Sequence, residues 1–186
     1  MFTERLSLIE TFTPLYAEIG LLVLLLVVLT VGLFTRPEQR RRVGLLAAVG
    51  ILVVLVSDLV ITLAQVDNPI YAGPVLGGML RYDMLSLIFR VMILAAGALT
   101  CLLSLDVPHL GRTGEFYAIV IVATLGMVLM TGSADLIMLF VALETTSISL
   151  YVLAGFLRNT RRSTEAGMKY YLFGAFTSGV LLYGLS

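Results

Sequence analysis

Two ionisable residues lie inside apolar stretches, where they could bind and release a proton. Glu144 begins the run Glu-Thr-Thr-Ser-Ile-Ser about ten residues into one apolar stretch, and Lys169 lies near the start of the next. A charge at the centre of a membrane helix costs roughly 2.5–3.5 kcal/mol on insertion scales, so such residues usually have a partner or a function. The pair therefore predicts a proton site in which Glu144 stabilises protonated Lys169.

Lys169 is the only lysine of the chain, and every other cationic side chain is an arginine. A buried lysine loses its proton readily, whereas an arginine stays charged. The alternative for Lys169 is a side chain that extends to the membrane surface, because its predicted depth is shallow. The alternative for Glu144 is a structural role in a hydrogen-bonded cluster.

The polar run around Glu144 points to all sides of a helix, so this helix is expected to be enclosed by protein. Phe140, Glu144, Ser147 and Tyr151 share one face and could line a hydrated path. Alternatively, the Thr and Ser hydroxyls bond to carbonyl groups one turn earlier and serve only the helix.

Other charged residues call for structural explanations. Asp58 and Arg90 fall at similar predicted depths on consecutive helices, which favours an ion pair between them. His109 lies in a loop rich in Pro and Gly and is expected to be exposed. The cluster Arg40-Arg41-Arg42 is expected to set the membrane topology and to contact anionic lipid.

The composition indicates a polytopic membrane protein. Hydrophobic residues make up 59% of the 186 and charged residues only 13%, with a mean hydropathy of +1.03. Soluble domains are about 25% charged.

The formal net charge is zero, which gives no reason to expect nucleic acid as a partner. One Cys and one His are too few for an iron–sulfur cluster bound by this chain alone, so we expect no cofactor or metal site here.

The apolar stretches predict an all-α bundle of about six transmembrane helices, since each span needs about 20 apolar residues. The first stretch contains nine consecutive apolar residues and is expected to face lipid.

The connection 65–81 is rich in Pro and Gly, which predicts turns or a short hairpin. Ser163 is the expected N-cap of the sixth helix, and Gly174/Ser178 and Ala175/Gly179 have the spacing of close helix contacts. The predicted spans are 15–34, 43–64, 82–105, 116–132, 135–157 and 164–186.

The distribution of arginines between the loops predicts the orientation of the chain in the membrane. The loops after the first, third and fifth spans carry eight arginines, whereas the opposite side carries two. Positively charged loops stay in the cytoplasm, so the N-terminus is expected to lie outside.

Several motifs resemble one known family. They are Glu115-Phe-Tyr-Ala, Ala134-Asp-Leu, Leu143-Glu144, Leu150-Tyr-Val-Leu-Ala-Gly, and Arg162-Ser-Thr-Glu-Ala-Gly-Met-Lys-Tyr-Tyr-Leu-Phe-Gly-Ala-Phe. They are similar to subunit N of the proton-translocating NADH–quinone oxidoreductases, which comprise respiratory complex I and its photosynthetic relative. The similarity is dense from about residue 113 onward and weaker before it.

The resemblance implies a site, partners and a location. Such subunits have about fourteen helices with two inverted repeats, and their half-channels use a Glu and Lys residues that match Glu144 and Lys169. Residues 1–112 would form helices one to three of a single domain, and residues 113–186 would begin the first repeat. Quinone, FMN and iron–sulfur clusters would belong to partner subunits. The expected location is the plasma membrane or a thylakoid or organellar inner membrane.

The resemblance implies that the chain is an N-terminal portion, or one part of a split subunit, because the sequence ends in the sixth helix, before the broken seventh helix and the second repeat of such subunits. Two other functions remain open. One is a subunit of a multisubunit cation/proton antiporter, and the other is a structural scaffold for neighbouring membrane proteins.

Overall fold

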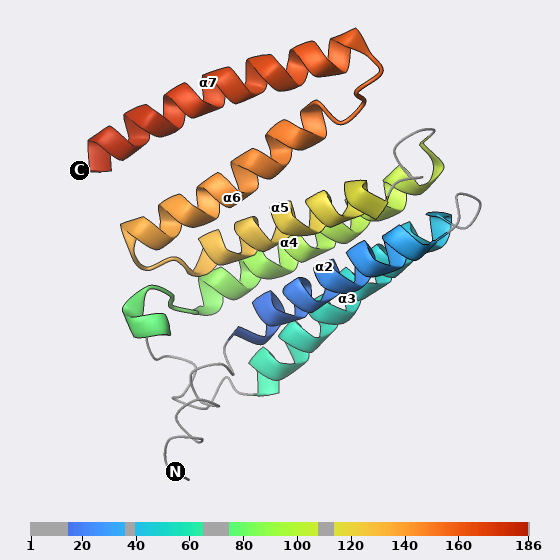
Figure 1. Cartoon of the computed structure of the whole chain (residues 1–186). Helices are drawn as coiled ribbons and strands as arrows, with labels where there is room; N and C mark the ends of the chain where they lie inside the picture. Colours follow the sequence, from blue (N-terminus) through green and yellow to red (C-terminus); the bar gives the residue numbers. More distant parts are fainter. Residues whose placement is uncertain (1–14, 36–39, 65–74, 108–113, 186) are drawn as a thin grey trace.

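The computed structural model describes residues 15–35, 40–64, 75–107 and 114–185, and these ranges are almost entirely helical (Figure 1). The predicted all-α fold is thereby confirmed. The helix bounds lie within a few residues of the predicted spans. The long helices are α2 (Tyr16–Phe34), α3 (Arg40–Ala64), α4 (Met84–Leu103), α5 (Gly114–Gly132), α6 (Leu136–Ala154) and α7 (Arg161–Leu185), with short 3-10 turns η4 (Leu76–Gly78) and η5 (Ser104–Asp106).

Helices α2 to α5 form a closed ring, and α6 and α7 extend outward from it. Each ring helix contacts the next in sequence, and α2 also contacts α5. Helix α6 then packs on α5, and α7 packs on α6, so that α7 forms the outer edge of the row (Figure 1). The helices alternate in direction, as short links between successive membrane spans require.

The hydrophobic core lies inside the ring. Leu21, Ile51, Leu94 and Ile121 come from the four ring helices, and each is fully buried. Helix α2 therefore has one face in this core, although the sequence predicted a helix exposed to lipid. Its other faces carry exposed apolar side chains. By contrast, Gly167 is the one buried residue of α7.

Five helices, α2 to α6, are long and apolar enough to cross a membrane among the residues that the structure describes. Helix α7 has 25 residues, which is a sufficient length, but its first third carries several charged side chains. The expected bundle of about six membrane helices thus corresponds to five clear spans and one less apolar helix.

A tight turn before α4 fixes one end of the bundle. Val75 and Leu80 exchange two backbone hydrogen bonds of 2.9 and 3.2 Å, and Gly77 at the tip has φ +68°. Arg81 N donates to Gly132 O at 2.8 Å, which ties the turn to the end of α5. The predicted hairpin is confirmed for residues 75–81, and the rest of that connection lies outside the described residues.

Helix α4 begins with a reciprocal cap. Ser86 N donates to the Asp83 side chain, and Asp83 N donates to Ser86 Oγ, both at 2.8 Å. This capping box satisfies two backbone donors that a helix start would otherwise leave without a partner. The cap holds Tyr82 beside the first turns of α4.

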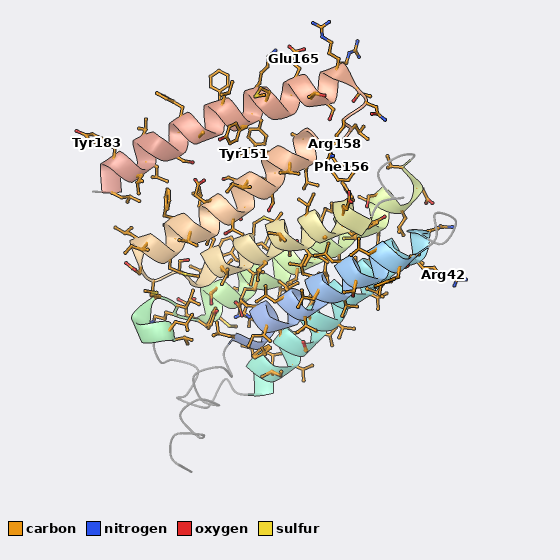
Figure 2. All side chains as sticks on the ribbon, in the orientation of Figure 1. Arg42, Tyr151, Phe156, Arg158, Glu165 and Tyr183 are labelled. Atoms are coloured by element: carbon orange, nitrogen blue, oxygen red, sulfur yellow. The ribbon has the colours of Figure 1, made fainter. Side chains whose placement is uncertain are left out.

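Arg41 and Arg158 lie at one end of the bundle, whereas Arg81 lies at the opposite end and Arg90 lies inside the ring. Arg41 Nη2 at the start of α3 lies 3.4 Å from Asp106 Oδ1 after α4. Arg158, in the link between α6 and α7, is at the same end (Figure 2). Which end faces the cytoplasm stays a prediction, and His109 lies outside the described residues.

Close packing of α5 on α6 depends on Gly126. A Cβ atom at this position would lie 2.5 Å from Thr146 Oγ1 and 3.0 Å from Ala142 O, so the helices would have to separate. We expect Gly126→Ala to lower the free energy of unfolding by about 1–3 kcal/mol through overpacking. The matched control is Gly179→Ala, whose Cβ would have no atom within 4 Å. Thermal unfolding in detergent measures both, and equal melting temperatures for the two variants would contradict the prediction.

Candidate functional site

Glu144 lies in the middle of α6 and faces α7. Its side chain is half-buried, and Ser178 Oγ donates a hydrogen bond of 2.5 Å to Glu144 Oε1. The carboxylate therefore has a partner on a neighbouring helix.

Small residues let α7 approach α6 closely enough for this contact. A Cβ atom on Gly167 would lie only 2.7 Å from Gly155 Cα. Farther along, the Tyr151 hydroxyl lies directly against Gly174, and the Tyr151 ring packs edge-on against Tyr170 with centroids 4.8 Å apart. Figure 2 shows Tyr151 reaching from α6 toward α7.

Of the two predicted pairs of small residues, Gly174/Ser178 faces α6. The other pair, Ala175/Gly179, does not, because Ala175 is exposed and Gly179 faces open space in the described structure. The Gly155–Gly167 contact was missed, since it joins a helix end to the next helix across the link.

Ser163 connects the two helices instead of capping α7. Helix α7 begins at Arg161, two residues earlier. Ser163 Oγ donates to Ala154 O at 2.8 Å and accepts from Leu157 N at 3.2 Å. The predicted N-cap is therefore wrong. The hydroxyl instead satisfies backbone groups at the end of α6, which holds the turn between the helices.

Lys169 is exposed and pairs with Glu165 on its own helix. Its Nζ atom lies 2.6 Å from Glu165 Oε1, one turn away. The structure does not bring Lys169 to Glu144. The reason is register, because Ser178 contacts Glu144 nine residues after Lys169, about 13 Å farther along the helix axis. The functional role of both residues stays a prediction.

The hydroxyl groups after Glu144 bond to their own helix. Thr145, Thr146 and Ser149 each donate to the carbonyl four residues earlier, at 2.8 to 3.1 Å. The structural explanation therefore holds for these three residues. Helix α6 lies between α5 and α7 but keeps exposed residues such as Val141 and Ile148, so the described chain encloses it only in part.

A second group of ionisable residues lies inside the ring. Arg90 Nη2 on α4 is 2.8 Å from Asp58 Oδ1 on α3, which confirms the predicted ion pair. The same nitrogen is 3.6 Å from Glu18 Oε2 on α2. Glu18 was missed, although it is the sole charged residue between Glu10 and Arg36.

Tyr82 completes this second group. The Arg90 guanidinium carbon lies 4.5 Å from the centroid of its ring, and its hydroxyl donates to Glu18 Oε1 at 2.8 Å. Burial, and then the nearby Glu18 carboxylate, raise the pKa of the Tyr82 phenol. Tyr82 therefore remains a neutral hydrogen-bond donor.

In the ranges described, no three His, Cys, Asp or Glu side chains gather where they could hold a metal ion. Several apolar spans with ionisable groups between them define a polytopic membrane protein that carries charge inside its helix bundle.

Comparison with known proteins gives a more specific class. Residues 133–186 match the family model described as NADH:quinone oxidoreductase/Mrp antiporter, TM. NADH-quinone oxidoreductase subunit N 2 of Roseiflexus castenholzii is 43% identical over 164 residues, which cover 86% of this chain and 31% of that protein. Subunit N of Rhodospirillum rubrum is 41% identical over 177 residues, which cover 93% and 35%.

A solved structure agrees with these relatives. A chain of respiratory complex I from Thermus thermophilus, determined with bound aureothin, superposes with a TM-score of 0.70 at 28% identity, over 90% of this chain and 35% of that chain. Sequence and fold together identify the chain as a member of the antiporter-like membrane subunits of NADH–quinone oxidoreductase, related to subunit N. The chain spans about a third of the length of the curated relatives it matches.

Removal of Arg90 should destabilise the ring strongly. In Arg90→Met, the Glu18 and Asp58 carboxylates would lose their cation in a site without water access. Loss of one partner of a buried ion pair costs about 3–5 kcal/mol. We therefore expect a large fall in the melting temperature and in the amount of folded protein in the membrane.

The control for Arg90→Met is Arg41→Met, which removes an exposed pair with Asp106. Exposed pairs contribute about 0–1 kcal/mol, so this variant should behave as the wild type. If Arg90→Met kept the wild-type melting temperature, the buried cluster would not stabilise the fold.

Proposed function

We propose that the chain is part of a membrane subunit of a proton-pumping NADH–quinone oxidoreductase, and that Glu144 and Lys169 contribute to its proton path. The names of the relatives support the first statement. The contact between Glu144 and Ser178 carries the second. A carboxylate near the middle of an apolar helix, bonded to a hydroxyl on the next helix, can accept a proton and pass it on.

The path would follow the interface between α6 and α7. Ser178 and Glu144 form one end of it, and Lys169 with Glu165 forms the other. Tyr151 lies between them, with its hydroxyl against Gly174. A phenol both donates and accepts hydrogen bonds, so Tyr151 can connect the two ends when water fills the remaining gaps.

Lys169 would hold its proton through the carboxylate beside it. Both side chains are exposed in the described chain, and exposed ion pairs contribute about 0–1 kcal/mol. Moving one proton against 100 mV requires about 2.3 kcal/mol. Separation of Lys169 from Glu165 would therefore supply only part of this energy, and a conformational change that also brings Glu144 nearer would have to supply the rest.

The redox chemistry would belong to partner subunits, which would carry quinone, FMN and iron–sulfur clusters. This chain would contribute membrane helices and ionisable side chains to the assembly, in the plasma membrane of a bacterium. The family model also includes Mrp antiporters, so a subunit of a cation/proton antiporter is the second candidate. Sodium-dependent proton exchange in vesicles without quinone would favour the antiporter.

Glu144→Gln tests the proposed function. The amide keeps the size and a hydrogen bond to Ser178 but cannot bind a proton under these conditions. We expect the assembled complex to keep electron transfer, or lose part of it, and to pump several-fold fewer protons per electron. Proton uptake and quinone reduction in the same vesicles measure this ratio.

The matched control is Glu115→Gln, which alters an exposed carboxylate at the start of α5. It should leave the ratio unchanged. If Glu144→Gln reduced assembly while pumping per electron stayed at the wild-type value, Glu144 would be a scaffold residue.

Tyr151→Phe tests the middle of the path. The phenylalanine ring keeps the edge-on contact with Tyr170, so folding should be preserved. Loss of the hydroxyl should slow proton pumping by a factor of about 10, the effect of roughly 1.4 kcal/mol on a barrier. Tyr183→Phe, near the end of α7, should have no effect on the rate. Equal pumping rates in wild type and Tyr151→Phe would remove Tyr151 from the path.

A further inference from the structure

The cluster of Glu18, Asp58 and Arg90 holds more negative than positive charge if all three groups are ionised. The relative exposures of the three side chains are 5%, 0% and 4%. They come from α2, α3 and α4, on the other side of α5 from Glu144. Two carboxylates and one guanidinium would give a net charge of −1 in the interior of a membrane protein. An uncompensated buried charge costs several kcal/mol.

The hydrogen bonds within the cluster are incomplete. Arg90 Nη2 contacts both carboxylates, so the two carboxylates are neighbours. Glu18 Oε2, both oxygens of Asp58, and Arg90 Nε and Nη2 are buried without a well-aligned hydrogen bond, although Arg90 Nη2 lies 2.8 Å from Asp58 Oδ1. Glu18 Oε2, which lies farther from Arg90, is therefore an oxygen that could bind a proton.

The polar side chains around the cluster do not supply the missing charge. Tyr82 donates to Glu18 Oε1. Tyr16 contacts the backbone oxygen of Asp58 and the hydroxyl of Thr62, at 3.2 and 2.9 Å. These phenols and the hydroxyl are neutral, and the cation that contacts the two carboxylates in the described structure is Arg90.

We propose that the cluster binds one proton, held between Glu18 and Asp58, and that it forms a proton-binding site separate from Glu144. One proton makes the cluster of two carboxylates and one guanidinium neutral. Two carboxylates that share a site generally cannot both ionise, and aspartic proteases use this effect. The same physical rule applies here, with Arg90 as the third member.

The proton belongs mainly to Glu18. Asp58 lies closer to Arg90 and takes the guanidinium as its ion-pair partner, whereas Glu18 lies 3.6 Å from the same nitrogen. A protonated Glu18 still accepts the hydrogen bond from Tyr82. The site therefore consists of a neutral Glu18 beside an Asp58–Arg90 ion pair.

Infrared spectroscopy can detect this proton directly, because a protonated carboxyl group has a C=O stretch distinct from the bands of a carboxylate. The experiment compares wild type and Glu18→Gln, purified at neutral pH in the assembly in which the protein occurs. We expect the wild-type-minus-variant spectrum to show a protonated carboxyl band that shifts in D2O. Glu165→Gln is the control, and its difference spectrum should show carboxylate bands only.

A second variant keeps the test decisive if Glu18→Gln does not assemble. In Asp58→Asn, Glu18 becomes the one carboxylate beside Arg90 and should release its proton to pair with it. The protonated carboxyl band should then disappear in this variant as well. Carboxylate bands alone in both difference spectra would overturn the proposal.

Discussion

A charge inside a membrane protein has to be neutralised where it lies, and this constraint governs how the chain folds. Arg90 cannot lose its proton, so α4 must pack against helices that bring carboxylates to it. Asp58 on α3 and Glu18 on α2 meet this need. Three helices with few other polar contacts are thereby fixed in rotation and depth. Apolar residues such as Leu21 and Ile51 fill the remaining space of the ring.

The interface between α6 and α7 is held together by different contacts from those of the ring. Its closest contacts involve glycine, which allows the helices to approach, and its polar contacts are few. Helix α7 is otherwise exposed in the described chain, and its Glu165 and Lys169 pair with each other. An interface of this kind can change its hydrogen bonds at small cost, whereas the ring around Arg90 cannot. This difference supports a path for protons at α6 and α7 and a fixed site in the ring.

Hydropathy was sufficient to predict the helices, because apolar length reports directly on membrane spans. Depth along those spans was sufficient to predict the Asp58–Arg90 pair. The rotation of each helix was not predictable, since it depends on which side chains pack. Glu18 was missed for that reason, as it lies in the helix that seemed most exposed to lipid. The Glu165–Lys169 pair was missed although its four-residue spacing is a known helical pairing, because Glu144, the carboxylate deeper in the membrane, was the expected partner of Lys169.

In the proposed path, Glu144 binds and releases a proton through its contact with Ser178. A double-mutant cycle tests this role, with proton pumping per electron measured for Glu144→Gln, Ser178→Ala and the double variant. If the two groups act as one unit, the double variant should lose no more pumping than the more affected single variant. If the two losses multiply, Glu144 and Ser178 act independently and the proposed path along α6 and α7 is wrong.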